Sequence, residues 1–310
     1  MSFISPFTAS TAKAGHGSIE LSVLPPDTPI LRNVSYQYPL KLVAPDPLPP
    51  PDRDNDADAP SLVHTIFLLT YGGGIVAGDA INLSVSLKGK TRLLLLTQGS
   101  TKIFKTPDPK LVSRQHMVVN LSAGAALVYL PDPVQPFAQT AFSQSQIYYL
   151  EDEQGSICAC DWVTSGRSAR GENWNIHEYK SRNEVWDRMQ LSERMDGYSV
   201  FGTLIIRGSV FSALAQHFLE EFEALPRIGG RDWGDAAQPE LSPKEQRRAQ
   251  RQIREKVDGL VWSAANVRGF VLVKFASREV EGSRNFLRDM IREAGSIATA
   301  FGERALLCLK

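Results

Sequence analysis

The sequence predicts a mainly β fold of the α+β kind, and two observations carry that prediction. Short apolar segments separated by Gly, Pro or Asp fill the first two thirds of the chain. Such segments are too brief for globular helices and are typical of strands. Helical spacing of apolar residues appears only late. Because helices and strands are segregated along the chain, a repeated βαβ arrangement is not indicated.

The strands follow one another in a regular order. In residues 81–87 apolar and polar side chains alternate, which is the period of a half-buried strand. Lys88-Gly89-Lys90 then predicts a hairpin turn into the next strand, residues 93–96. Comparable segments predict further strands at 65–69, 117–121, 126–130, 147–150, 157–163, 200–206 and 269–275.

Three helices are expected in the last third. A first apolar stripe predicts a helix over about 209–225, and a second stripe predicts a C-terminal helix over about 287–297. Between them, Ser242-Pro243-Lys244-Glu245 resembles a capping box with proline at the first helical position, which predicts a solvated surface helix over 243–257.

We interpret residues 1–310 as a single domain that carries two insertions. Residues 44–60 are nearly all Pro and Asp, so they cannot bury enough apolar surface to offset the entropy of ordering and are expected to be disordered. Residues 226–258 are polar and form the second, helical insertion.

Composition excludes several classes of function. Lys+Arg and Asp+Glu both number 34, so no global field attracts nucleic acid or an anionic membrane. The three cysteines fit a reducing compartment better than a disulfide framework. There is no signal-like leader and no run of eighteen apolar residues. The sequence therefore predicts a soluble, cytoplasmic protein without a membrane or nucleic-acid partner.

A glycine-rich segment at residues 72–79 (GGGIVAGD) invites a phosphate-binding interpretation, since Gly72, Gly74 and Ala77 fit G-x-G-x-x-A. A dinucleotide site, however, needs the glycines to open a helix, and here a strand follows. In the Walker pattern, Asp79 stands where a lysine should grip phosphate. A glycine-rich strand connection is favoured; a cofactor-binding β-rich enzyme that uses this loop remains the alternative.

Other patterns point weakly to chemistry. The sequence has no nucleophile elbow, H-E-x-x-H pair or C-x-x-C, which argues against an independent hydrolase. Cys158 and Cys160 share one face of a strand and could touch a soft metal ion, although buried free cysteines are mostly small hydrophobic residues. A basic run could face RNA or simply form a solvated helix face; its members are Arg247, Arg248, Arg251, Arg254 and Lys256.

Four blocks in order resemble the UreD/UreH family of urease accessory proteins. The first is residues 15–21 (GHGSIEL) with 38–41 (YPLK), and the second is 73–79 (GGIVAGD) with 96–104 (LTQGSTKIF). The third is 130–138 (LPDPVQPFA), and the fourth is 166–172 (GRSARGE). Chance matches do not keep order and spacing, so the four together are specific.

The resemblance implies a layered, helix-like stack of β-sheets with a small two-helix element. It also implies a non-catalytic nickel-insertion chaperone with no tightly bound cofactor. Such proteins bind apo-urease and a UreF-like helical protein, through which a UreG-like GTPase is recruited. Ni²⁺ passes transiently through an internal tunnel to urease.

Three carboxylates are the candidate nickel-path residues, because a conduit must release the ion and scattered carboxylates bind it weakly. They are Asp79, Asp161 and Glu172. The alternatives are that Asp79 caps a turn, that Glu172 pairs with Arg167 or Arg170, and that Asp161 is simply exposed. The glycines Gly72, Gly73, Gly74 and Gly78 are expected to provide positive φ and close strand approach, and Gln98, Thr101 and Lys102 to orient the turn.

Overall fold

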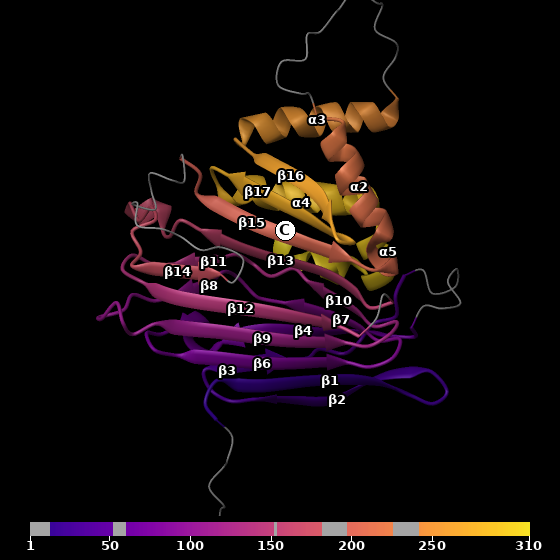
Figure 1. Ribbon diagram of the computed structural model, residues 1–310, viewed down its shortest axis with the longest axis horizontal. Helices are drawn as coiled ribbons and strands as arrows, with labels where there is room; N and C mark the ends of the chain where they lie inside the picture. The colour runs from indigo at the N-terminus through magenta and orange to yellow at the C-terminus, as the bar shows by residue number, and fades with distance from the viewer. Residues whose placement is uncertain (1–12, 52–59, 152–153, 182–196, 226–241) are drawn as a thin grey trace, which may run out of the picture.

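The computed structural model describes residues 13–51, 60–151, 154–181, 197–225 and 242–310, and its strands form two large sheets (Figure 1). The six-stranded sheet has the order β14 (Glu178–Ser181), β12 (Ala141–Leu150), β9 (Ser113–Leu121), β6 (Ala80–Leu87), β1 (His16–Leu24), β2 (Thr28–Tyr36). The main order of the eleven-stranded sheet is β16 (Val261–Val267), β17 (Phe270–Ser277), β15 (Val200–Arg207), β13 (Ser156–Thr164), β10 (Ala126–Tyr129), β7 (Arg92–Leu96), β4 (Val63–Thr70), β3 (Leu40–Val43).

Three short strands complete the eleven-stranded sheet as a side ladder: β5 (Gly74–Ile75), β8 (Thr101–Ile103) and β11 (Val134–Pro136). The chain runs from a strand of the larger sheet through one of these to a strand of the six-stranded sheet, and then returns. Successive windings place β4, β7, β10 and β13 parallel to one another, and β6, β9 and β12 likewise. This solenoid-like winding confirms the predicted helix-like stack and the mainly β class.

The predicted strands are all present, but the prediction of a hairpin at Lys88-Gly89-Lys90 is wrong. This turn joins β6 to β7, which lie in different sheets and do not pair. Instead, β6 pairs in parallel with β1 on one side and with β9 on the other. The turn, whose three residues are exposed, therefore carries the chain from one sheet to the other at the surface.

Two hydrophobic cores flank the larger sheet, and β7 shows how one strand serves both. Its sequence RLLLL is buried throughout. Leu93 and Leu95 pack into the core between the two sheets, while Leu94 and Leu96 pack into the core on the opposite face, under the helices. An uninterrupted apolar run is thus explained by a strand that is covered on both faces.

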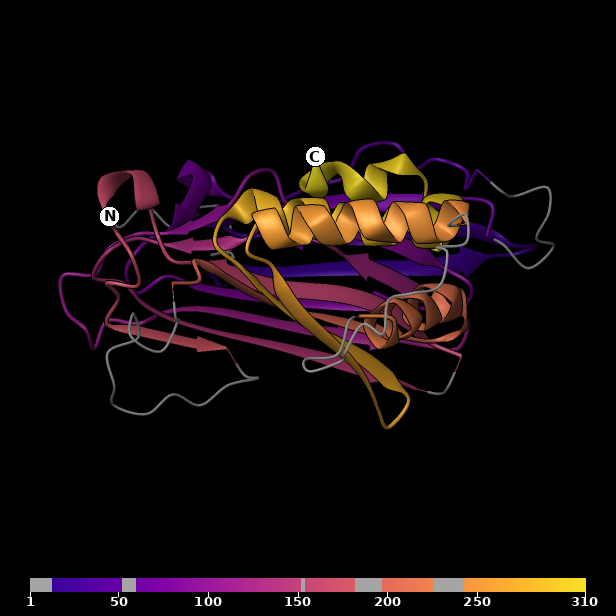
Figure 2. The same cartoon turned by 90° about the horizontal axis from the view of Figure 1, so that it is seen from above.

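The helices gather beside the last strands of the larger sheet (Figures 1 and 2). They are α2 (Ser212–Glu223), α3 (Pro243–Val257), α4 (Val280–Ala294) and α5 (Ser296–Phe301), followed by the 3₁₀ segment η4 (Glu303–Leu309). The second apolar stripe continues through a break, because Gly295 ends α4 in a left-handed conformation with φ of 74°. The Ser242 capping box at the start of α3 is present as expected, with Ser242 Oγ accepting from the Glu245 N–H.

The two expected insertions are described in part. Residues 52–59 and 226–241 lie outside the described residues, so the disorder expected within 44–60 stays a prediction. On the flank of the first insertion, Leu48 bridges to Val63, and Arg304 donates to the Asp46 carbonyl at 3.1 Å. In the second, α3 is not solvated on all sides, since Arg251 and Glu255 are buried.

Candidate functional site

The recognised sequence blocks converge at the carboxyl ends of β4, β7 and β10, where the side ladder runs along the solenoid. Gly74 of the glycine block stands opposite Lys102, and Lys102 stands opposite Gln135 of the third block. The Gln135 amide also reaches the Gly166 carbonyl of the fourth block at 3.4 Å. Strands from the second and third blocks therefore form one continuous backbone ladder, and a side-chain hydrogen bond ties the fourth block to it; we call this region the motif end.

Glu172 ties the fourth block to the third. Its carboxylate pairs with Arg167, whose Nε donates at 2.9 Å, and it accepts the Ala138 N–H at 3.2 Å. The Arg167 hydrogen bond is the largest cause that lowers the pKa of Glu172. The Arg167 guanidinium also lies 3.8 Å from the centroid of the Phe137 ring. Glu172 thus makes the predicted pair with Arg167, while Arg170 is exposed at the end of the 3₁₀ turn η2 (Ser168–Arg170).

Asp79 closes the turn that follows the glycine block. Its carboxylate accepts the Val76 N–H at 3.0 Å, and its own N–H donates to the Val76 carbonyl at 3.0 Å. These are the bonds of a turn-capping aspartate. They leave one carboxylate oxygen without a hydrogen bond among the described residues.

The glycines of the block are required for two different structural reasons. Gly72, Gly73 and Gly78 have φ of 76°, 72° and 84°, a region that suits glycine. Gly74 is extended, and its role comes from close approach: a Cβ there would lie 2.5 Å from the Lys102 carbonyl oxygen. After the 3₁₀ turn η1 (Tyr71–Gly73), the run opens strand β5 and not an α-helix, so no helix N-terminus is available for a pyrophosphate.

The residues expected to orient this turn lie along the ladder. Thr101 pairs with Val134, and its N–H donates to the Pro133 carbonyl at 3.2 Å. Lys102 pairs through its backbone and its side chain is exposed; Gln98 is exposed in the turn before β8.

Sequence reasoning missed the buried polar centre of this region, which is Asp132. Its side chain is 6% exposed; it accepts the Thr97 hydroxyl at 3.1 Å, the Gly99 N–H at 2.8 Å and Arg284 at 2.7 Å. Arg284 comes from α4 and also donates to the carbonyl of Cys308. Asp132 therefore fixes the second and third blocks to the C-terminal helices. An acid inside the run LPDP, directly after an apolar strand, was the available signal.

Asp161 lies between the two sheets. It follows Ile157 and Ala159 on the face of β13 that meets the six-stranded sheet. The Gln144 amide donates to one carboxylate oxygen at 2.6 Å, and the Ser181 hydroxyl donates to the other at 2.8 Å. Burial raises the pKa of Asp161, and these hydrogen bonds oppose the rise. The alternative that Asp161 is simply exposed is therefore wrong, because strands of the facing sheet cover it.

More polar groups surround this carboxylate. The Gln144 amide also donates to the Tyr179 hydroxyl at 3.0 Å, and the Gln144 carbonyl oxygen is buried without a hydrogen-bond partner in the described structure. Burial raises the pKa of Tyr129 and of Tyr148, with the charge of Asp161 adding to the rise in both. A polar cluster thus interrupts the apolar core between the sheets.

The cysteines do not form a metal site in the described structure. Cys158 and Cys160 face the helix-side core, and burial raises the pKa of both thiols, which opposes the thiolate form that binds metals. Within the described ranges no cluster of three or more His, Cys, Asp or Glu side chains is placed to hold an ion. The same ranges contain no helix that is both long and apolar enough to span a bilayer.

Most arginines of the basic run on α3 form ion pairs with acidic side chains, largely from neighbouring helices. Arg248 and Arg251 both bind Glu221 of α2, Arg251 also binds Glu255 and Glu293, and Arg254 binds Asp289 of α4. This pattern serves helix docking and does not present an open basic face to RNA.

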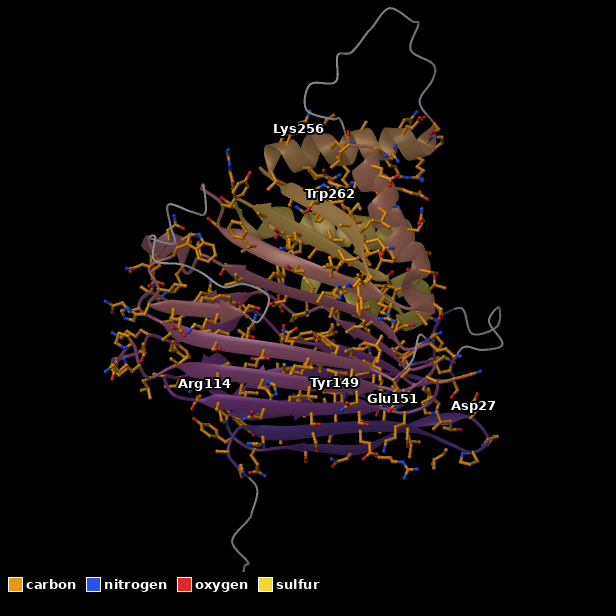
Figure 3. All side chains as sticks on the ribbon, viewed as in Figure 1. Asp27, Arg114, Tyr149, Glu151, Lys256 and Trp262 are labelled. Atoms are coloured by element: carbon orange, nitrogen blue, oxygen red, sulfur yellow. The ribbon has the colours of Figure 1, made fainter. Side chains whose placement is uncertain are left out.

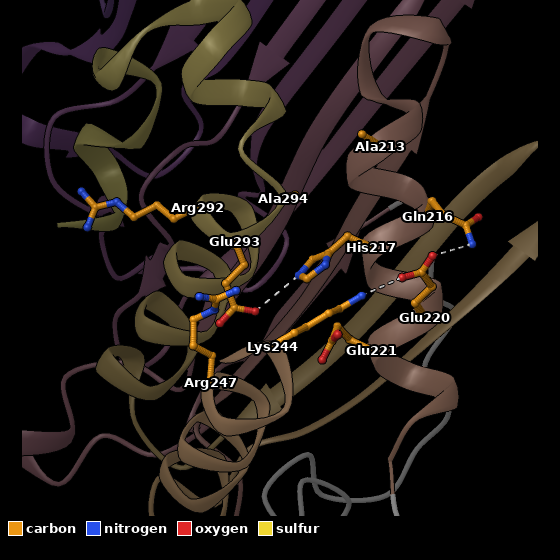
Figure 4. A pocket seen from close by; sticks show the side chains of 10 residues that line it. All are labelled: Ala213, Gln216, His217, Glu220, Glu221, Lys244, Arg247, Arg292, Glu293 and Ala294. Carbon is orange, nitrogen blue, oxygen red and sulfur yellow. Dashed lines mark hydrogen bonds and ion pairs between the residues drawn. The ribbon is translucent and has the colours of Figure 1, made fainter. Parts of the chain in front are cut away.

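Beside this network lies an open hollow of about 700 Å³ between α2, α3 and α4 (Figure 4). Its charged lining is balanced, since Lys244, Arg247 and Arg292 face Glu220, Glu221 and Glu293. The hollow therefore offers no strong selectivity for either sign of charge, and Lys244 pairs with Glu220 at 3.1 Å.

Comparison with known proteins covers the same regions. Residues 15–306 match the model of a family described as UreD urease accessory protein. The chain is 30% identical to urease accessory protein 4 of Cryptococcus neoformans, in an alignment that covers 94% of this chain and 93% of that protein. It is 34% identical to urease accessory protein UreD of Sorangium cellulosum, over 94% of this chain and 82% of that protein. A UreD-like protein of Schizosaccharomyces pombe is 27% identical, over 86% of this chain.

Proposed function

Because the chain belongs to the UreD urease accessory protein family, we propose that it is a non-catalytic scaffold for the maturation of urease in the cytoplasm. It binds apo-urease and a UreF-like helical protein, through which a UreG-like GTPase joins the complex. The observation that carries the proposal is the family match over residues 15–306, which includes both sheets and the helices.

The cargo of this scaffold is Ni²⁺, which passes through without a tightly bound resident site. The polar cluster around Asp161 supports a path between the sheets, because a divalent cation needs oxygen ligands or water when it crosses an otherwise apolar core. A carboxylate with neutral oxygen neighbours binds Ni²⁺ weakly enough to release it. Asp79 and Glu172 stay candidates for the same path, and their hydrogen bonds at the motif end give each a structural role in addition.

Co-elution tests the scaffold role. The chain is mixed with apo-urease, alone and with the UreF-like protein, and each mixture is passed over a size-exclusion column. We expect the chain to move into the urease peak. If it elutes only at its own volume in every mixture, the scaffold role is contradicted.

Replacing Asp161 with asparagine should slow urease activation severalfold at limiting nickel while the complex still assembles. Asparagine keeps the size of the side chain but removes the charge that compensates a passing cation. Activation is measured with apo-urease, both accessory partners, GTP and Ni²⁺. The matched control is Asp27→Asn, in the exposed turn between β1 and β2, at the opposite end of the strands from the side ladder (Figure 3).

An intact Asp161→Asn complex that activates urease as fast as the control would contradict the nickel path past this residue. If the complex does not form, Asp161 would instead be assigned to folding, and the melting temperature of the isolated variant would be lower than that of the control.

A further inference from the structure

Four large apolar side chains are exposed at the motif end. Tyr38 is 63% exposed, Tyr71 is 45%, Val76 is 50% and Leu111 is 43%. The two tyrosine rings pack together with centroids 5.7 Å apart. Leu111 packs beside Gly78, two residues after Val76. An apolar strip therefore follows the glycine block across the surface, which is uncommon for a face that stays in water.

Lysines surround this strip. Lys41 lies 5.7 Å from the centroid of the Tyr71 ring. Lys102, Lys105 and Lys110 are exposed, and no carboxylate among the described residues lies within ion-pair distance of them. Arg114, at the start of β9, lies at the same end (Figure 3).

The two nearby aspartates accept hydrogen bonds from backbone N–H groups. Asp79 accepts the Val76 N–H, and Asp108 accepts the Lys110 N–H at 2.9 Å. Basic side chains outnumber acids on this strip although the whole chain has a formal net charge of zero. The excess of positive charge is thus local to the motif end.

An aromatic and aliphatic centre with a charged rim is the composition of a protein-docking surface. Single-stranded RNA is a poorer fit, because Asp79 and Asp108 lie among these lysines and would repel its phosphates. Charge complementarity instead calls for acidic side chains on the partner.

We propose that the surface formed by Tyr38, Tyr71, Val76, Leu111, Lys41, Lys102, Lys105 and Lys110, the motif-end patch, docks an acidic surface of a protein partner. The inference rests on the proposed function in one respect: it takes apo-urease as that partner. The rigid ladder beneath the patch holds it ready for docking, because β5 and β8 fix the glycine block to the body.

The test measures the affinity of the whole chain for apo-urease at low and at moderate salt. Two variants probe the patch: Lys102→Glu with Lys105→Glu, and Tyr71→Ser. The control is Arg247→Glu with Lys256→Glu. Both residues are on α3, which lies far from the side ladder (Figure 1), and the change of charge is the same. Melting temperatures show which variants are folded.

We expect the lysine variant to bind at least about tenfold more weakly at low salt, and this difference to shrink as salt is added. Tyr71→Ser should weaken binding by a similar factor at both salt concentrations, and the control should bind like the unsubstituted chain. If the lysine variant melts early, the Tyr71→Ser result decides.

Equal affinity of all folded variants for apo-urease would overturn the proposal that the motif-end patch is the docking surface, and it would leave the scaffold role unchanged. Competition by an RNA oligonucleotide at lower concentration than urease would overturn the choice of a protein partner. Failure of the unsubstituted chain to bind apo-urease would overturn both the proposed function and this inference.

Discussion

Arg251→Met is expected to lower the free energy of unfolding by about 4 kcal/mol, because removing one partner of a buried ion network leaves uncompensated charge. Arg251 is 3% exposed and binds Glu221 at 2.5 Å, Glu255 at 3.0 Å and Glu293. Glu221 is 1% exposed, so water cannot replace the lost guanidinium. Chemical denaturation of the variant and the unsubstituted chain measures the difference.

The same substitution should change how stability depends on pH. Burial disfavours the ionised form of Glu221, but hydrogen bonds from Arg248 and Arg251 outweigh it and lower its pKa to about 2. A lowered folded pKa contributes stability that is complete above the ordinary value of 4.5 and is lost as pH falls towards 2. Losing Arg251 brings the pKa of Glu221 in the folded protein closer to its ordinary value. The free energies of unfolding of the two proteins should therefore differ less at pH 3 than at pH 7.

The control for this prediction is Arg254→Met, on the same helix. Arg254 pairs with Asp289 but is 52% exposed, and such surface pairs contribute about 1 kcal/mol or less. Equal losses in the two variants would show that α3 is held by helix propensity or packing and not by the buried network.

Gly74→Ala is expected to cost about 3 kcal/mol or to prevent folding, since overpacking against backbone is poorly relieved. The added Cβ would lie 2.5 Å from the Lys102 carbonyl oxygen and 2.6 Å from the Phe104 ring. The pairing of β5 with β8 would have to open. Thermal unfolding followed by circular dichroism measures the loss.

Gly155→Ala is the matched control, because this glycine is also without a positive φ but its added Cβ would meet only ordinary contacts, the nearest at 3.5 Å from Leu150. It should melt within a few degrees of the unsubstituted chain. A Gly74→Ala protein that melts equally high would mean that the ladder tolerates a side chain there and that close approach does not explain the glycine.

The strands could be predicted from the sequence because alternation and short apolar runs are local signals. The sheet that each strand joins could not be predicted from the sequence. The turn at Lys88-Gly89-Lys90 has the composition of a hairpin, yet β6 pairs with strands from the neighbouring windings, and that choice depends on the whole winding. Positive φ and close strand approach could both be predicted for the glycine block, but not that Gly74 alone of the four serves by close approach to the Lys102 backbone, because that strand arrives later in the chain.

The candidate site divides in the same way. The motif blocks gave the residues of the ladder, since their order is visible in one dimension. Asp132 was missed because its partner Arg284 lies 152 residues away. The arginines of α3 suggested a solvated or RNA-facing surface, because all but one of the acids that hold them are on α2 and α4 and only folding brings them together.

The nickel content of urease after reconstitution tests the central proposal most directly. Apo-urease is incubated with Ni²⁺, GTP, the UreF-like protein and the UreG-like GTPase, with and without this chain, then purified and assayed for bound nickel and activity. We expect bound nickel and urease activity both to be several times higher when the chain is present. Equal nickel content and activity with and without the chain, under conditions where the other components are active, would contradict a role in nickel insertion.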